Sequence, residues 1–200
     1  MLKILVVEDQ AMVRGAISNL LSLEDNISIV GQVADGESAL AFIENNPVDI
    51  VLSDIEMPNM SGIELAEHIH QQYPKIRVMI MTTFSKSGYI RRAIDAGVMA
   101  FILKESPIDY LVSAISQVEK NKRVIEPELA IMALEDNDPL SPKERKAIKL
   151  AGEGLKTCEI AKKLFLSEGT VRNYLSEGIS KLNAANRIDA ARIAKQKGWI

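Results

Sequence analysis

The order of apolar and polar residues along the chain predicts two regions of different construction. In the first region, short runs rich in Ile and Val alternate with segments whose apolar residues recur at helical spacing. The predicted strands are residues 2–7, 27–34, 48–53, 77–82 and 99–104, and the predicted helices are residues 10–23, 37–45, 62–72, 89–96 and 108–120. Strands with almost no polar residue are typical of a parallel sheet covered by helices on both faces. The pattern therefore predicts a doubly wound α/β domain with a five-stranded parallel sheet.

The alternation ends after Asn121, and this change predicts a domain boundary. We interpret residues 1–121 as the first domain and residues 122–138, which end in an acidic run, as a linker that contains at most a short helix over residues 128–134. Every later segment has a helical pattern. Residues 139–200 are therefore predicted to form a small all-α domain.

Capping signals predict where the helices of this second domain begin. Ser141, Pro142 and Glu144 combine an N-cap serine, proline at the first helical position and glutamate at the third, which is a capping box. Thr157 and Ser167 are further N-cap candidates. The remaining helices are expected to begin near Cys158, Glu168 and Ile188.

Charge is distributed unevenly between the two regions. The whole chain has a formal net charge of −3. Residues 1–137 contain 11 basic and 20 acidic residues, a net charge of −9, whereas residues 138–200 contain 13 basic and 7 acidic residues, a net charge of +6. Chance variation of surface charge is the alternative. A change of net charge from negative to positive at a predicted domain boundary instead favours two domains with different partners, of which the basic one would bind phosphate backbones.

Composition excludes several classes of protein. No apolar run approaches the roughly 18 residues of a membrane span, and the apolar and charged content is that of a globular chain. The start of the chain has no cleavage signal, and Cys158, which we expect to be buried, is the only cysteine. No disulfide can therefore form within the chain, and we expect a reducing, cytoplasmic location.

Polar residues follow the predicted strands at the ends where ligands bind in doubly wound sheets. Glu8 and Asp9 follow the first strand, Asp54 the third, Thr82 the fourth and Lys104 the fifth. With a strand order of 2-1-3-4-5, the first and third strands are neighbours and the three carboxylates converge. Oxygen ligands without His or Cys suit a hard divalent ion, Mg²⁺ before Zn²⁺.

This combination predicts phosphoryl chemistry. A carboxylate beside Mg²⁺ can act as a nucleophile toward a phosphoryl group, and Asp54 is centrally placed to form an aspartyl phosphate. Thr82 would donate a hydrogen bond to a phosphoryl oxygen, and Lys104 would pair with the same group. A single acid at a strand end is more often a turn or cap residue, but four strand ends with complementary chemistry favour a functional site.

Residues 1 to about 120 resemble two-component receiver domains through four segments, 6–10, 54–58, 81–83 and 102–104. The resemblance implies phosphotransfer from a sensor histidine kinase to Asp54. It also implies an Mg²⁺ ion held by Glu8, Asp9, Asp54 and the backbone carbonyl of Glu56.

The same resemblance assigns Thr82 and Phe101 to a switch in which the hydroxyl turns toward the phosphoryl group and the ring moves inward. A plain core aromatic is the alternative for Phe101. Many receivers have proline directly after the lysine, and the peptide bond between the two is usually cis. Here Lys104 is followed by Glu105, so the sequence leaves open whether this bond is cis.

The basic region contains the pattern of a helix-turn-helix. Residues 159–164 would be the supporting helix, residues 164–167 the turn and residues 168–181 the second helix. Arg can pair with guanine and Asn with adenine, and hydroxyls and lysines can hold phosphates. The candidate DNA-binding residues are Ser167, Thr170, Arg172, Asn173, Ser176 and Lys181. A small helical bundle with a solvated charged face is the alternative.

Residues 139–200 resemble the LuxR/NarL type of helix-turn-helix, so the whole chain resembles NarL/FixJ-type response regulators. The family usually has lysine at the position of Arg172, often histidine at Tyr174, and positive charge near Ser176, so the base contacts carry over by position only. Val171 and Ile160 are expected in the core. The last helix has a predicted core face of Ile188, Ala191 and Ala194, and in the family this helix often pairs two DNA-binding domains.

We therefore expect a transcription regulator in which phosphorylation of Asp54 promotes dimerisation and promoter binding, with no enzymatic activity beyond its own phosphotransfer and dephosphorylation. In this family receivers dimerise through the first and fifth helices or through the face of the fourth strand and fifth helix, and both remain open. One rival is an Mg²⁺-dependent aspartyl phosphatase, which would require an aspartate at Glu56 and a domain that encloses the substrate. Another is a basic domain that binds a protein such as RNA polymerase instead of DNA.

Overall fold

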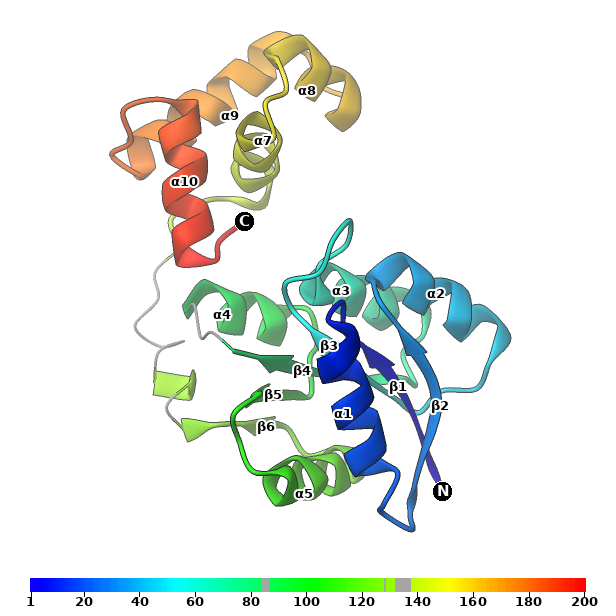
Figure 1. Ribbon diagram of the computed structural model, residues 1–200. Helices are drawn as coiled ribbons and strands as arrows, with labels where there is room; N and C mark the ends of the chain where they lie inside the picture. The colour runs from blue at the N-terminus through cyan, green and yellow to red at the C-terminus, as the bar shows by residue number, and fades with distance from the viewer. Residues whose placement is uncertain (84–86, 128, 132–137) are drawn as a thin grey trace. The chain divides into compact units, whose positions relative to one another are not determined.

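A computed structural model describes residues 1–83, 87–127, 129–131 and 138–200 (Figure 1). Apart from residues 86–89, which group with the later residues, the chain divides near residue 132 into two compact units, and each is described by itself. We call the described residues up to 131 the N-terminal unit and residues 138–200 the C-terminal unit. No described helix combines the length and apolarity that a bilayer span requires.

The N-terminal unit is built on a parallel sheet with the strand order β2-β1-β3-β4-β5-β6. Its strands are β1 (Leu2–Val7), β2 (Ile27–Val33), β3 (Ile50–Asp54), β4 (Arg77–Thr82), β5 (Ala100–Leu103) and β6 (Val124–Ile125). The doubly wound class and the expected order of the first five strands are confirmed. The prediction of five strands is corrected to six, because the segment after the fifth helix adds an edge strand.

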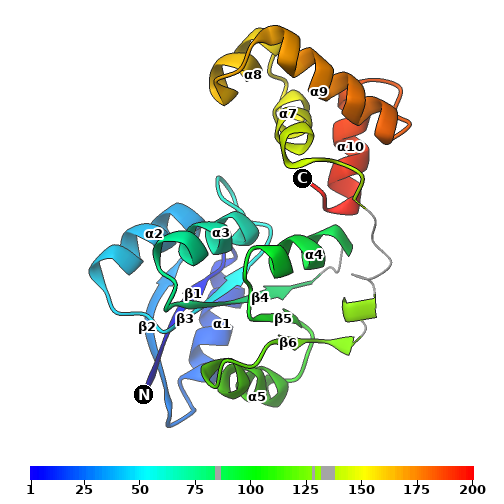
Figure 2. The same cartoon turned by 180° about the vertical axis from the view of Figure 1, so that it is seen from behind.

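Helices cover both faces of this sheet (Figures 1 and 2). On one face lie α1 (Ala11–Leu21) and α5 (Ile108–Glu119), and on the other α2 (Gly36–Asn45), α3 (Gly62–Gln72) and α4 (Ser87–Asp95). The side chains of α1 and α5 pack on alternate strand residues such as Ile4, Leu52 and Ile102, as the period of two in a strand requires. Both faces are thus buried, which explains the nearly unbroken apolar strands.

Strand β6 lies within the segment predicted as linker. Val124 and Ile125 pair with Ala100 and Phe101 of β5, and Val124 N donates to Met99 O at 2.8 Å. Leu129 is buried and lies in a short helical stretch. The predicted helix over residues 128–134 lies partly outside the described residues, which include only 129–131 of it.

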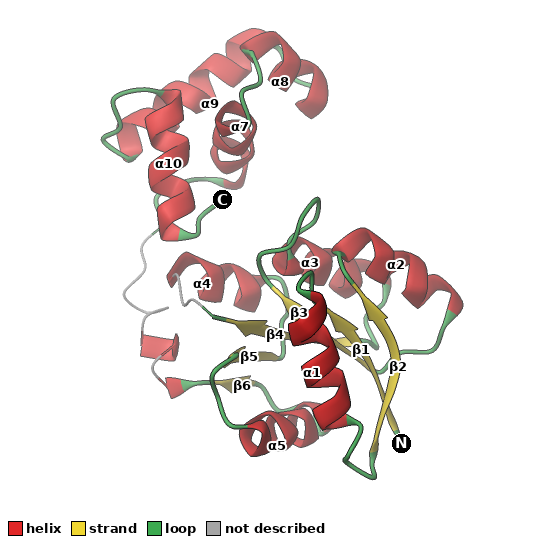
Figure 3. Cartoon of the chain, in the orientation of Figure 1, coloured by secondary structure: helices red, strands yellow, loops and turns green. Residues whose placement is uncertain are grey.

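The C-terminal unit is made only of helices in its described part (Figure 3). They are α7 (Pro142–Gly152), α8 (Thr157–Leu164), α9 (Glu168–Lys181) and α10 (Arg187–Lys197). The capping box of Ser141 and Glu144 and the N-cap role of Ser167 are confirmed. The prediction for Thr157 is wrong: Thr157 is the first residue of α8, and the Glu159 carboxylate accepts a hydrogen bond from Lys156 N at 2.6 Å.

Two further expectations for this unit are corrected. Cys158 is exposed, because it lies on the side of α8 opposite the buried Ile160 and Ala161. Ile188 is 52% exposed, whereas Ala191 and Ala194 are buried as expected. In the described part of the chain every peptide bond is trans, including the one after Lys104.

Candidate functional site

Three carboxylates meet at the carboxyl end of the sheet. Glu8 follows β1 and Asp54 ends β3, and the two strands are hydrogen-bonded neighbours with Val7 opposite Ser53. Oxygens of Glu8, Asp9 and Asp54 lie within 4.8 Å of one another. Glu8 and Asp54 are buried, whereas Asp9 is exposed. The predicted acidic cluster is therefore present in the structure.

Lys104 supplies the cation of this cluster. Its Nζ lies 2.6 Å from Glu8 Oε2 and 3.1 Å from Asp54 Oδ2. Its backbone N donates to Thr82 O at 2.8 Å, which fixes the loop after β5 to the end of β4. The ammonium thus joins the carboxyl ends of strands β1 and β3.

Burial and charge shift the ionisation of these groups in a consistent way. Burial raises the pKa of Glu8 and of Asp54, and the Lys104 ammonium opposes but does not cancel this increase. Burial alone would lower the pKa of Lys104, but its contacts with Glu8 and Asp54 outweigh this effect and raise it. Two buried carboxylates share one ammonium, so a further cation at this place would stabilise their charged forms.

The donor set fits Mg²⁺. The side chains of the cluster offer only carboxylate oxygens, which are the ligands that hard divalent ions prefer. Glu56 follows the cluster in the chain with an exposed side chain, and its backbone carbonyl is the fourth predicted ligand. With Asp9 exposed, one side of the cluster is open to solvent.

Thr82 and Phe101 lie on the same face of the sheet. Phe101 pairs with Ile80 of β4, and Ile80 and Thr82 are two residues apart, so all three side chains point the same way. Both residues are buried, with exposed fractions of 4% for Thr82 and 1% for Phe101. The two residues predicted to act as a switch are thus brought to one face on neighbouring strands.

Gly62 supports the position of Asp54, and the sequence analysis missed it. Its N donates to Ile55 O at 3.0 Å, and a Cβ at this position would lie 1.9 Å from Asp54 O. The Ser53 hydroxyl donates to the same carbonyl oxygen at 2.8 Å. A glycine directly after the N-cap Ser61 was the only available signal, and it does not reveal the contact.

Glu126, directly after β6, connects that strand to the loop beside Lys104. Its Oε1 accepts a hydrogen bond from the hydroxyl of Ser106, two residues after Lys104. Its carboxylate also raises the pKa of Tyr110, an effect second to the burial of that tyrosine. The start of the predicted linker therefore lies at the carboxyl end of the sheet, in contact with the loop that follows Lys104.

Helix α9 presents a polar face to solvent. Val171, Leu175 and Gly178 are buried. Among the predicted DNA-binding residues, Arg172, Asn173 and Ser176 are exposed on the opposite side of the helix. Ser167 accepts a hydrogen bond from Thr170 N at 3.1 Å, and their hydroxyls are 2.8 Å apart, so these two side chains also cap the helix.

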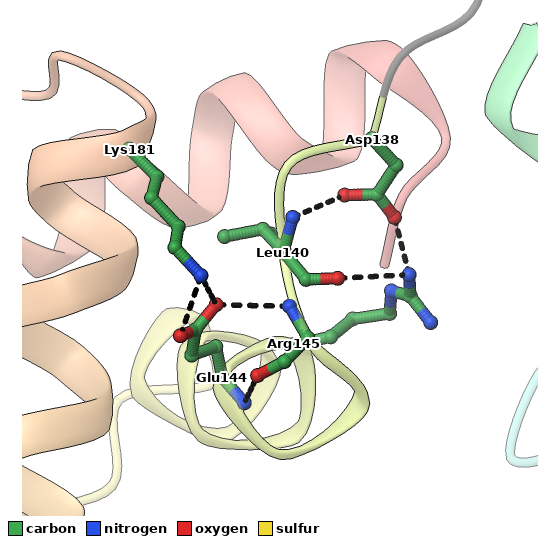
Figure 4. A network of polar contacts seen from close by, with 6 residues as sticks. Asp138, Leu140, Glu144, Arg145 and Lys181 are labelled. Atoms are coloured by element: carbon green, nitrogen blue, oxygen red, sulfur yellow. Dashed lines mark hydrogen bonds and ion pairs between the residues drawn. The ribbon is translucent and has the colours of Figure 1, made fainter.

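Lys181 differs from the other candidate DNA-binding residues. Its Nζ lies 2.8 Å from both carboxylate oxygens of Glu144 on α7 (Figure 4). Glu144 is buried and also accepts from Ser141 N at 2.9 Å, while Arg145 beside it pairs with Asp138. Lys181 therefore has a structural partner, and its contact with DNA stays a prediction.

Comparison with protein families matches both units. The family described as "Response regulator receiver domain" matches residues 4–116. The family "Bacterial regulatory proteins, luxR family" matches residues 138–194. The chain belongs to the two-component response regulators. It is a transcriptional response regulator with a LuxR-type helix-turn-helix domain, and not a classical enzyme.

Curated relatives span the full length of this response regulator. The "Uncharacterized transcriptional regulatory protein YvfU" of Bacillus subtilis is 44% identical over 200 residues, which are 100% of both chains. DesR of the same organism is 41% identical, again over 100% of both chains. The response regulator protein VraR of Staphylococcus aureus is 31% identical over 206 aligned positions, with 100% of this chain and 99% of that one covered.

Two solved structures contain folds similar to those of both units. ChrA, the response regulator of a heme-sensing two-component system, is 29% identical with a TM-score of 0.57 and coverage of 100% of this chain and 98% of its own. RcsB from Salmonella enterica, bound to the promoter rprA with BeF₃⁻, has a TM-score of 0.72 at 22% identity and coverage of 97% and 98%. The second likeness shows the fold alone.

Proposed function

We propose that this response regulator is switched by phosphorylation of Asp54 by a sensor histidine kinase, and that the switch controls dimerisation and promoter binding. The observation that supports this most strongly is the site itself: a buried carboxylate at the end of β3 with an ammonium at 3.1 Å and two further carboxylates beside it. A structural salt bridge would require only one acid. The regulator would act in the cytoplasm, where the kinase domain and the promoter are accessible.

The chemistry follows from the placement of these groups. A carboxylate oxygen of Asp54 attacks the phosphorus of a phosphohistidine; the new P–O bond forms as the P–N bond breaks, and the imidazole leaves with the electron pair. Glu8, Asp9, Asp54 and the carbonyl of Glu56 would hold Mg²⁺, which supplies positive charge to the phosphoryl oxygens. Lys104 pairs with the same oxygens and leaves its contact with Glu8 to do so.

Thr82 and Phe101 would transmit the effect of phosphorylation along the face of the sheet that they share. A Thr82 hydroxyl that donates to the phosphoryl group moves toward the carboxyl end of the sheet and frees space on the face it shares with Phe101. The ring then fills that space. This arrangement makes the pair a population switch, because the phosphoryl group favours the conformation in which both contacts are made.

The exposed face of α1 is the best supported dimer surface. Met12 is 85% exposed and Leu20 45% exposed, and both lie with the exposed Ala16 on one stripe of α1 at spacings of four residues. Leu23, two residues after the end of the helix, is a further exposed apolar residue with 78% exposure. Exposed apolar stripes mark contact sites. This favours the pairing through α1 and α5 over the face of β4 and α5.

The C-terminal unit would bind promoter DNA through α9. Arg172, Asn173 and Ser176 provide groups that can reach base edges from the exposed face. Ser167 and Thr170 lie at the start of the helix, where phosphates are favoured. Lys181 would have to leave its contact with Glu144 in order to reach a phosphate. Contact with RNA polymerase is an additional role for the DNA-bound form.

The test uses the full-length protein with Mg²⁺ and phosphoramidate. Light scattering after gel filtration is expected to show a shift from monomer to dimer, with tighter and salt-dependent binding of duplex DNA. Asp54→Asn should abolish both changes, and Leu20→Glu should abolish the dimer while phosphorylation remains. A protein that hydrolyses a phosphomonoester with turnover, or whose dimerisation survives Asp54→Asn, would contradict the proposal.

A further inference from the structure

Phe165 has an unusual position in the C-terminal unit. It directly follows α8, in the turn of the helix-turn-helix, and its side chain is 95% exposed. Its backbone has φ 55° and ψ 45°, which is the left-handed region. An aromatic side chain therefore projects into solvent from a backbone conformation that bulky residues rarely adopt.

The fold requires the left-handed backbone at this position, but it does not require an aromatic side chain there. The turn requires a positive φ at Phe165 because the chain turns back after it, so that the N–H of Leu166 donates to Ala161 O at 2.9 Å and closes α8. Glycine or asparagine meets that requirement at lower cost. The other described non-glycine residues with positive φ are all asparagines, at Asn59, Asn121 and Asn183. Phe165 is the exception in the described part of the chain, and a residue that is strained and nearly uncovered indicates a contact outside its own fold.

The surroundings of Phe165 indicate the partner. Lys162 and Lys163 are exposed in the last turn of α8, and Ser167, two residues after Phe165, caps α9. In a helix-turn-helix the second helix enters the major groove while the first crosses the backbone. The connecting turn then lies near the wall of the groove. Two lysines beside an aromatic ring are complementary to phosphates and the apolar edges of deoxyriboses.

We propose that Phe165 is a DNA-contacting residue whose ring packs against the sugar-phosphate backbone at the edge of the groove. The proposal rests on the proposed DNA-binding function of α9 and names a further contact of the same surface. The ring has no hydrogen-bonding group, so its contribution does not depend on base sequence. Lys162 and Lys163 would hold the flanking phosphates.

Phe165→Gly tests this contact without damaging the turn, since glycine accepts the left-handed backbone. Affinity is measured with the full-length protein and a fluorescein-labelled duplex of mixed sequence, by anisotropy at a series of salt concentrations. We expect binding about five- to tenfold weaker at every salt concentration, as for the loss of a modest apolar contact. The slope of log Kd against log salt should stay the same, because the ring has no charge. Phe165→Tyr should keep most of the affinity.

Asn183→Gly is the matched control, because it relieves the other positive φ of a non-glycine residue described in this unit (φ 48°) without removing an apolar group. It should leave the affinity unchanged, and the emission of Trp199 should show that both variants are folded. Full affinity in folded Phe165→Gly, or an equal loss in Asn183→Gly, would overturn the proposal. Absence of salt-dependent binding in the wild type would overturn the proposed DNA-binding function itself.

Discussion

The ammonium of Lys181 lies 2.8 Å from both carboxylate oxygens of Glu144, and this pair joins the last turn of α9 to the first turn of α7 (Figure 4). Glu144 is 2% exposed, whereas the side chain of Lys181 is 40% exposed. Lys181 and Ser141 N thus stabilise the charged form of this carboxylate. Helix α9 is therefore held at its C-terminal end by this pair, whereas the sequence predicted capping for Glu144 and DNA contact for Lys181.

Lys181→Met should therefore destabilise the C-terminal unit by about 1–3 kcal/mol, because it leaves a buried carboxylate with fewer partners. Trp199 is the only tryptophan of the chain and belongs to the core of this unit, so urea unfolding followed by its fluorescence reports this unit alone. Arg192→Met is the control, since Arg192 pairs with Asp189 at the surface. It should cost less than about 1 kcal/mol. Equal costs would contradict a structural role for the buried pair.

The stability of the same unit should depend on pH through Glu144. Burial alone would raise the pKa of Glu144, but hydrogen bonds from Lys181 and Ser141 outweigh it and lower the pKa below its ordinary value of 4.5. As pH falls, the unfolded chain binds the proton first, so the contribution is complete above the ordinary value and is lost as pH falls through it toward the lower folded value. Glu144→Gln should remove this pH-dependent contribution to stability. The difference in unfolding free energy between the wild type and Glu144→Gln should therefore shrink on acidification. A constant difference would contradict the assignment.

Gly62→Ala should displace the backbone of Asp54, because the new Cβ would lie 1.9 Å from its carbonyl oxygen. We expect a loss of more than about 2 kcal/mol in the thermal stability of the N-terminal unit together with slower phosphorylation. Gly15→Ala is the matched control, since a Cβ there meets nothing within 4 Å. In helix α1 it should stabilise by about 0.5–1 kcal/mol. Similar melting temperatures for the two variants would show that the close approach is not rigid.

Strand β6 should stabilise the receiver. A chain that ends after Asn121 loses the pairing of β6 with β5 and the buried side chains of Val124 and Leu129, whereas a chain that ends after Ile131 keeps them. We expect the shorter chain to be less stable by about 2–4 kcal/mol, measured by thermal unfolding followed by circular dichroism. Equal stability of the two fragments would show that the segment is a linker throughout.

Periodicity was sufficient to predict most of the fold. Long apolar runs and helical repeats specify five strands and their helices because each element buries its own face. Strand β6 has only two residues and no periodicity of its own, so it is determined by the edge of β5 that it covers. Cys158 and Ile188 were misplaced for a related reason: which side of a short helix is buried depends on its neighbours.

The candidate site was predictable where the chain order alone brings residues together. Glu8, Asp9, Asp54 and Lys104 all follow strands, and parallel strands bring these ends to one edge. The support of Asp54 by Gly62 and the role of Glu144 toward Lys181 depend on contacts between distant elements. Residue type and spacing contain no signal for such contacts.

We propose above that Asp54 is the phosphoacceptor of this response regulator. Intact-mass spectrometry of the protein with Mg²⁺ and phosphoramidate, beside Asp54→Asn and the exposed control Asp95→Asn, tests it most directly. We expect one added phosphoryl group on the wild type and on Asp95→Asn, which digestion should map to the peptide that contains Asp54, and none on Asp54→Asn. An adduct of the same yield on Asp54→Asn, or a phosphorylated peptide elsewhere in the chain, would contradict it.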